Sequence, residues 1–125
     1  MYAKILVSVL LLGAAALAQA LEVKPYSAQA LAAAQKAGQP VAIQFHADWC
    51  TTCKMQEAAL QSLKAEPELN FTVLVANFDT EKALKQRFNV RAQSTIVVLR
   101  GKQERARLVG DTSATGIRGA LKAAL

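Results

Sequence analysis

The stretch that decides the fold of this chain reads Trp49-Cys50-Thr51-Thr52-Cys53-Lys54, and it follows the strand-like run Val41–His46. Its two cysteines are the only ones in the chain. A structural zinc site needs four ligands, and this chain offers no second cysteine pair and only one histidine, His46. The spacing and the missing partners therefore predict dithiol chemistry and no metal site.

The first 20 residues have the pattern of a secretory signal peptide. Lys4 supplies a positive charge, Ile5–Leu17 is a mostly apolar run, and Ala18-Gln19-Ala20 is a small-x-small cleavage site. An uncleaved membrane anchor is the alternative, but a spanning helix needs about 20 apolar residues. We therefore predict cleavage after Ala20, a domain at 21–125, and a periplasmic or secreted location in which disulfides can form.

Charge and length argue against a nucleic-acid-binding protein and against a chain of several domains. The formal net charge is +6, of which Lys4 contributes one. The remaining basic residues are scattered and are not interleaved with aromatic residues, so they predict a basic surface and no nucleic-acid partner. Residues 21–125 contain no repeat or linker and have the length of one small domain. No feature indicates an oligomer, and we expect a monomer.

Strand-like and helix-like segments alternate after residue 20, which predicts an α/β domain. Helices between strands predict parallel strand pairs, and a final hairpin adds an antiparallel edge. The spacing of Met55, Ala59, Leu60 and Leu63 predicts the buried face of the second helix, and Thr80 is the predicted cap of the third. We expect strands at 21–23, 41–46, 71–78, 94–99 and 105–109, and helices at 27–37, 50–64, 80–88 and from 111 onward.

The element order and several motifs resemble the thioredoxin family over nearly all of residues 21–125. Ala47-Asp48-Trp49-Cys50 is especially similar to the C-terminal thioredoxin-like domain of the bacterial transmembrane disulfide reductase. The resemblance implies the thioredoxin fold, with a central mixed sheet flanked by helices on both faces, and thiol–disulfide oxidoreductase activity without a cofactor. The motifs are Gly38-Gln39-Pro40-Val41, Phe45–Cys50, Cys53-Lys54-Met55, Asn77-Phe78-Asp79, Phe88–Arg91 and Leu108-Val109-Gly110.

The position of the pair assigns a role to each cysteine. Cys50 stands at a helix N-terminus, where free N–H groups and the helix dipole favour a thiolate, so it is the predicted nucleophile. Cys53 lies one turn further on and is the predicted resolving residue of a redox-active Cys50–Cys53 disulfide. A purely structural disulfide is the alternative, but so small a loop removes little entropy from the unfolded chain.

Neighbouring residues refine this prediction. Thr51 and Thr52 replace the histidine that strongly oxidising family members carry between the cysteines, which favours a reductase or an isomerase-like exchanger. Trp49 is expected to cover the rim of the site or to serve simply in packing. Lys54 either adds positive potential or is a solvated surface lysine. His46 either transfers protons directly or is a packed, half-exposed histidine.

The chain also departs from the family. The family's buried Asp and its Lys partner correspond to Gln44 and Val75, so the usual proton acceptor for Cys53 is absent. The family's cis-proline corresponds to Ser94, and a trans Gln93–Ser94 bond is expected because a cis bond costs about 2.5–4 kcal/mol without proline. Ser94 and Thr95 are the predicted substrate-binding residues in this altered loop.

Two functions therefore compete. The first is an exported enzyme whose partners are exported proteins with disulfides or thiols, together with a membrane electron donor. The second is a non-catalytic thioredoxin-fold module that binds exported thiol proteins or a metal, and the changes at Gln44 and Ser94 are its support.

Overall fold

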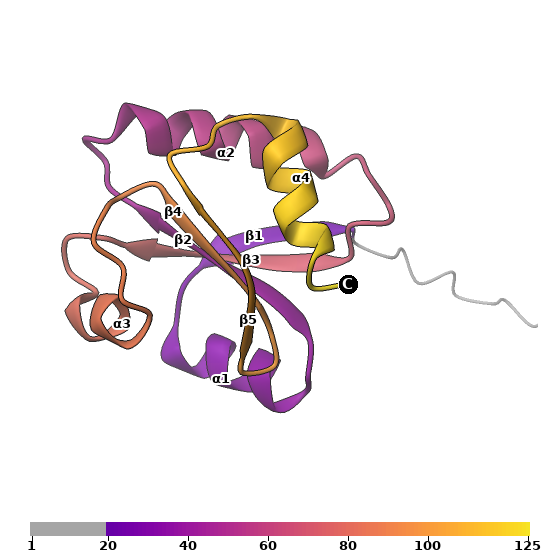
Figure 1. Cartoon of the computed structure of the whole chain (residues 1–125), viewed down its shortest axis with the longest axis horizontal. Coiled ribbons are helices and arrows are strands. Elements are labelled where there is room, and N and C mark those ends of the chain that lie inside the picture. Colours follow the sequence, from indigo (N-terminus) through magenta and orange to yellow (C-terminus); the bar gives the residue numbers. More distant parts are fainter. Residues whose placement is uncertain (1–19) are drawn as a thin grey trace, which may run out of the picture.

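The computed structural model describes residues 20–125, in which a five-stranded sheet lies between two layers of helices (Figure 1). Helices α2 and α4 cover one face of the sheet, and α1 and α3 cover the other. The predicted signal peptide lies outside the described residues, apart from Ala20. The elements are β1 (Leu21–Pro25), α1 (Ala28–Lys36), β2 (Pro40–His46), α2 (Thr51–Leu63), β3 (Phe71–Asn77), α3 (Lys82–Arg87), β4 (Thr95–Arg100), β5 (Gln103–Val109) and α4 (Ala114–Lys122).

The strand order is β1-β3-β2-β4-β5. Strand β3 pairs in parallel with β1 and β2, whereas β4 is antiparallel to both β2 and β5. The mixed sheet is confirmed, but the rule that a helix between strands makes them parallel is wrong for β4. Helix α3 has 6 residues and spans about 9 Å at 1.5 Å per residue. Both ends of the segment that holds α3 are bonded to the end of β2, by Phe78 N–H to the His46 carbonyl at 2.7 Å and by Ser94 N–H to the Phe45 carbonyl at 2.9 Å, so β4 starts at the edge where β3 ends.

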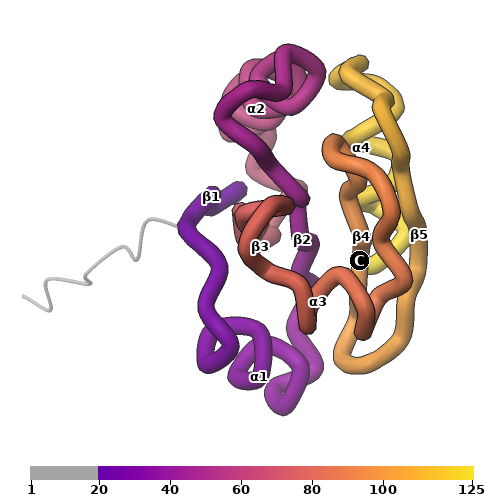
Figure 2. The backbone as a smooth tube through the Cα atoms, turned by 90° about the vertical axis from the view of Figure 1, so that its left-hand side faces the viewer, coloured from indigo at the N-terminus to yellow at the C-terminus, as the bar shows by residue number. Residues whose placement is uncertain are grey.

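Each face of the sheet has its own apolar core. Alternate side chains of β2 point to opposite faces, so Ala42 packs toward α2 and α4 while Val41 and Ile43 pack toward α1 and α3. In Figure 2, α2 lies above the strands and α1 lies below them. This alternation places Gln44 on the α2 face with Ala42, although it is an amide at a fully buried position.

The structure tests the predicted helix caps and the predicted buried face of α2. Ser27 caps α1 as expected, because its side chain accepts a hydrogen bond from the backbone N–H of Ala30 at 3.0 Å. Thr80 is not the cap of α3, because the capping position is Glu81 and no side chain bonds there. Met55 is 53% exposed, so the prediction that it is buried was wrong. Leu60 and Leu63 are buried as predicted, and Cys53 and Gln56 complete the buried face of α2.

Candidate active site

The site is built on the N-terminus of α2. Strand β2 ends at His46, and a tight turn closed by a 3.0 Å bond from Cys50 N–H to the Ala47 carbonyl leads into the helix. Cys50 has extended backbone angles and occupies the capping position. Its sulfur accepts a hydrogen bond from the Cys53 N–H at 3.1 Å. The sulfur therefore takes the place of a serine or aspartate cap and receives one of the free N–H groups of the helix.

Cys50 and Cys53 form a disulfide, with their Cα atoms 5.3 Å apart. Cys50 is 3% exposed and Cys53 is 0% exposed. The pair packs against Ala47 and partly buried Phe78. The first cysteine is therefore the one nearer to solvent, which is the order expected for an attacking residue and a resolving residue.

Ser94 faces the disulfide from the turn before β4. Its hydroxyl oxygen lies 3.1 Å from the Cys50 sulfur and 3.2 Å from the Cys53 sulfur. The described residues contain no cis peptide bond, so the expected trans Gln93–Ser94 bond is confirmed. Ser94 itself has a positive φ of 62°, which is uncommon for a residue with a Cβ atom.

A buried pair of amides lies beneath the disulfide. Gln44 Nε2 donates to the Cys53 carbonyl at 3.2 Å and to Gln56 Oε1 at 3.3 Å. Gln56 Nε2 in turn donates to the Ser94 carbonyl at 2.8 Å and to the Asp111 carbonyl at 3.0 Å. Both side chains are 0% exposed. This pair ties β2, α2, the Ser94 turn and the start of α4 together.

Gln44 and Val75, which stand where the resembling family has Asp and Lys, lie side by side in the sheet. They are register partners on β2 and β3. A carboxylate at one and a lysine at the other would be adjacent, and the chain has replaced both. Gln44 donates hydrogen bonds without a charge, which avoids a lone buried ion. Its Oε1 atom is buried and has no hydrogen-bond partner among the described residues.

Trp49 and Asp79 form the rim on one side of the cysteines. Trp49 is 61% exposed, and its indole N–H donates to Asp79 Oδ2 at 2.9 Å. Asp79 is held in turn, because its backbone N–H donates to Asn77 Oδ1 at 2.9 Å. Trp49 therefore has its polar edge fixed and its ring open to solvent.

His46 faces carboxylates. Its Nε2 lies 3.1 Å from Asp48 Oδ1, and its Nδ1 lies 2.7 Å from Glu57 Oε1 at an angle outside hydrogen-bond geometry. The hydrogen bonds of the two sulfurs within residues 20–125 do not include His46. Its side chain is 18% exposed, which matches the packed alternative. Lys54 is exposed on the first turn of α2.

The N-terminus of α4 faces the site through Gln56. Ser113 caps this helix, and Asp111 Oδ1 accepts from both the N–H and the hydroxyl of Ser113 at 2.8 Å. These bonds, chiefly the one from the backbone N–H, hold the pKa of Asp111 below its usual range. The Gln56 bond to the Asp111 carbonyl therefore joins the cysteine turn to a second capped helix start.

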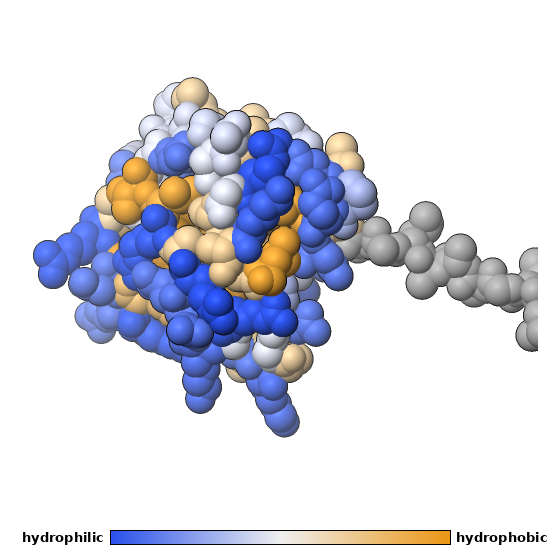
Figure 3. All heavy atoms as spheres, turned by 45° about the vertical axis from the view of Figure 1, so that its right-hand side comes forward, coloured by the Kyte–Doolittle hydropathy of each residue, from blue (hydrophilic) through white to orange (hydrophobic). Residues whose placement is uncertain are grey.

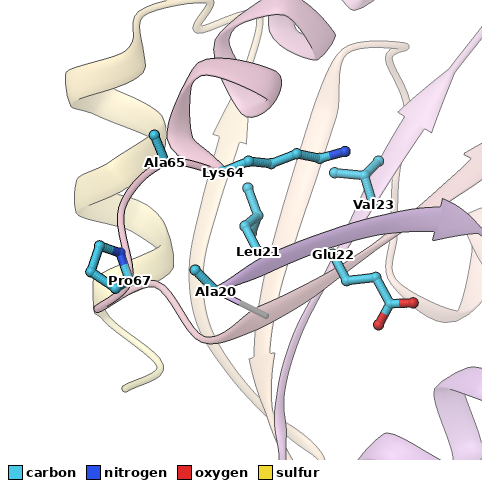
Figure 4. A pocket seen from close by; sticks show the side chains of 7 residues that line it. All are labelled: Ala20, Leu21, Glu22, Val23, Lys64, Ala65 and Pro67. Carbon is cyan, nitrogen blue, oxygen red and sulfur yellow. The ribbon is translucent and has the colours of Figure 1, made fainter. Parts of the chain in front are cut away.

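Two hollows of the described surface lie away from the disulfide. One of about 460 Å³ is lined by the start of β1 and the loop after α2, at the opposite end of α2 from the cysteines (Figure 4). Another of about 420 Å³ is lined by α3 and the residues after it. The face in Figure 3 is largely hydrophilic, with separate apolar areas between polar ones.

Two further properties of residues 20–125 concern metal binding and membrane spanning. No group of three or more metal-binding side chains comes together there. No helix in that range has the length and apolar character to cross a membrane.

Gln56, Glu57, Asp79 and Asp111 are the site residues that the sequence analysis missed. Gln56, Asp79 and Asp111 bond to partners 30 to 55 positions away in the chain, and Glu57 lies against His46 of β2. One signal was available for Gln56, because it falls on the Cys53, Leu60 and Leu63 face of α2.

Residues 22–123 match the family model described as Thioredoxin. Among solved structures, Trxlp from Edwardsiella tarda superposes with a TM-score of 0.74 and 42% identity, covering 80% of this chain and 98% of that one.

Curated relatives match shorter segments. The bifunctional thioredoxin reductase/thioredoxin of Mycobacterium leprae is 32% identical over 71 residues, which cover 57% of this chain and 16% of that protein. Thioredoxin-1 of Drosophila yakuba is 31% identical over 70 residues, which cover 56% of this chain and 65% of that protein. The matched segments thus span less than two thirds of these two relatives.

Proposed function

The chain belongs to the thioredoxin family, and we propose that this thiol–disulfide oxidoreductase works outside the cytosol as a reductase or isomerase-like exchanger of protein disulfides. The observation that carries the proposal is the Cys50–Cys53 disulfide, whose first sulfur caps α2 and accepts the Cys53 N–H. The same N–H and the helix dipole would stabilise a Cys50 thiolate once the bond is reduced.

The reaction uses the two cysteines in turn. The Cys50 thiolate attacks one sulfur of a substrate disulfide and bonds to it, while the other substrate sulfur leaves as a thiolate and takes a proton from water. Cys53 then loses its thiol proton and attacks the Cys50 sulfur. The Cys50–Cys53 disulfide forms, and the second substrate sulfur leaves, so two electrons pass to the substrate. A thiol donor then reduces the pair.

The direction of electron flow is inferred from the residues between the cysteines. Thr51 and Thr52 bring no positive charge to the Cys50 sulfur, so the reduced form lacks the stabilisation that makes a strong oxidant. We expect a potential well below the value of about −120 mV that characterises a strong oxidant. Titration in glutathione buffers measures it, and a value near −120 mV would overturn the reducing direction.

The location outside the cytosol rests on residues 1–20. A positive charge, an apolar run and a small-x-small site together favour export with cleavage after Ala20. We expect the full chain expressed in a bacterium to be recovered from the periplasm with Leu21 as its first residue, as mass spectrometry would show. Recovery in the cytosol with residues 1–20 intact would contradict the proposal.

Partners follow from the same proposal. We infer that the monomeric domain exchanges disulfides with exported proteins that carry thiols or disulfides, at the surface around Trp49, Lys54 and the turn of Ser94 and Thr95. The likeness of Ala47-Asp48-Trp49-Cys50 to the C-terminal domain of a transmembrane disulfide reductase supports a membrane protein as the electron donor. Nucleic acid is not among the proposed partners.

The deciding experiment is reduction of insulin with a small thiol as donor. We expect the wild type to accelerate insulin precipitation and Cys50→Ser to leave it at the uncatalysed rate. Equal rates for the two proteins would favour the non-catalytic binding module, for which the low exposure of both sulfurs is the supporting observation.

A further inference from the structure

The Ser94 hydroxyl contacts both reacting sulfurs at once, at 3.1 Å from Cys50 and 3.2 Å from Cys53. A serine hydroxyl has one proton to donate and can rotate it between two acceptors. We propose that Ser94 is a catalytic hydrogen-bond donor that stabilises whichever of the two sulfurs is the thiolate, an inference that rests on the proposed use of the pair as a dithiol.

Cys53 depends on this donor more than Cys50 does. The Cys53 sulfur is 0% exposed, and its other hydrogen-bond partner is the Phe45 carbonyl at 3.6 Å. A carbonyl oxygen accepts from a thiol but repels a thiolate. The Cys50 sulfur, in contrast, also receives the Cys53 N–H at 3.1 Å. Ser94 is thus the one hydrogen-bond donor to the Cys53 sulfur within residues 20–125.

The hydroxyl is held in place by its own backbone. The Ser94 N–H donates to the Phe45 carbonyl at 2.9 Å, and its carbonyl accepts from the Gly110 N–H at 3.0 Å and from Gln56 Nε2 at 2.8 Å. The partners lie on β2, on α2 and just after β5, and together they keep Ser94 at a φ of 62°. A residue held in such a conformation by its surroundings is typical of functional sites.

The donor serves successive steps without changing its own protonation. In the reduced protein it bonds to the Cys50 thiolate. After Cys50 has bonded to a substrate sulfur, the hydroxyl rotates to Cys53, whose thiol proton ends on the departing substrate sulfur. Cys53 then bonds to Cys50, the Cys50–substrate bond breaks, and the disulfide of the present structure results.

The test compares Ser94→Ala and Ser94→Gly with the wild type. Both variants lack the hydroxyl, but glycine adopts a positive φ without strain, so their comparison separates the hydroxyl from the backbone. The substrate is a small aromatic disulfide whose released thiolate absorbs visible light. Its first release reports attack by Cys50, and its second reports resolution by Cys53. The pKa of Cys50 follows from the pH dependence of alkylation.

We expect both variants to raise the Cys50 pKa by about one unit, since a hydrogen bond to a charged group is worth about as much as a one-unit shift. We also expect the second release to slow by about tenfold or more in both. Ser62→Ala is the matched control, because this exposed hydroxyl on α2 bonds only to the Ala59 carbonyl, and it should change neither value.

Three outcomes would overturn the inference: an unchanged pKa and second release in the two Ser94 variants, a defect in Ser94→Ala that Ser94→Gly does not share, or a wild type that shows no second release. Circular dichroism of the oxidised variants checks that they are folded. The assay needs no protein substrate, donor or compartment. A wild type that resolves the small disulfide but does not reduce insulin would therefore refute the proposed function and leave this inference standing.

Discussion

The N-termini of α2 and α4 share one sequence pattern and use it in different ways. Asp48-Trp49-Cys50 precedes α2, and Asp111-Thr112-Ser113 precedes α4. In each, the third residue caps the helix by accepting the N–H of the residue three positions on, at 3.1 Å for Cys50 and 3.0 Å for Ser113. The difference lies in the capping atom, because a serine oxygen stays neutral and a cysteine sulfur can ionise.

The aspartates of the two patterns also differ. Asp111 turns toward its own cap and accepts two hydrogen bonds from Ser113. Asp48 turns away from Cys50 and lies 3.1 Å from the ring of His46. A carboxylate bonded at the cap would add a negative charge beside the Cys50 thiolate and oppose it. One local structure thus holds a neutral oxygen at the start of α4 and an ionisable sulfur at the start of α2, and the two aspartates point in different directions.

Replacing the capping atom should have the largest effect. Cys50→Ser gives α2 the cap of α4, so we expect catalysed disulfide reduction to be lost while the helix start is retained. Cys50→Ala should lose both. Under reducing conditions the alanine variant should unfold with about 1 kcal/mol less free energy than the serine variant, the usual value of an N-cap. Insulin reduction and urea unfolding measure the two properties, and equal stabilities would contradict the equivalence of the caps.

The cap of α4 should be sensitive to volume. A Cβ added at Gly116 would overlap Asp111 Oδ2 and lie 2.8 Å from Ser113 Oγ. We expect Gly116→Ala to destabilise the domain by about 1–3 kcal/mol through this overpacking. Thermal unfolding checks the value.

Gly119 on the same helix is the matched control, because a Cβ there meets no atom within 4 Å. Gly119→Ala should stabilise the domain by about 0.5–1 kcal/mol through reduced backbone entropy. Equal effects of the two substitutions would show that the Asp111–Ser113 arrangement does not restrict Gly116.

The features that local sequence determines could be predicted. Cys50 at a helix start, Ser27 as a cap and the buried run of β2 each depend on residues within a few positions of one another. The predicted face of Met55, Ala59, Leu60 and Leu63 was right for Leu60 and Leu63 and wrong for Met55. Its apolar spacing was sound, but the buried place on that turn is taken by Gln56. A buried amide is stable only with partners, and those of Gln56 lie on β2 and two distant turns.

The contacts between distant segments could not be predicted. The absence of proline at Ser94 could be read from the sequence, but the approach of its hydroxyl to both sulfurs joins residues more than 40 positions apart. The direction of β4 was missed for a related reason. It depends on the hydrogen bonds that hold both ends of the connection after β3 at the end of β2, and these join residues that are far apart in the sequence.

His46 provides a finer test of the comparison. If it holds Asp48 away from the α2 cap, then His46→Phe frees the carboxylate to turn onto the helix N-terminus as Asp111 does. We expect the Cys50 pKa to rise by about half a unit, the size of an exposed charge–dipole effect. The pH dependence of alkylation measures it. Adding Asp48→Asn should restore the original value, and a shift that persists in the double variant would mean that His46 acts in another way.

The smallest expected effect is a pH dependence at the α4 cap. The hydrogen bonds from Ser113, that of its backbone N–H above all, lower the pKa of Asp111 in the folded state below its value in the unfolded chain. The unfolded state therefore binds the proton more readily, so this carboxylate stabilises the domain above its unfolded pKa. That contribution disappears as the pH falls through the folded pKa.

Asn at position 111 keeps an oxygen acceptor for Ser113 and does not titrate. We thus expect Asp111→Asn to lose less thermal stability than the wild type between neutral and strongly acidic pH, as melting temperatures across that range would show. If the melting temperatures of the two proteins fell equally with pH, the charge of Asp111 would not stabilise the domain. The α4 cap would then depend on the shape of the Asp-Thr-Ser turn alone.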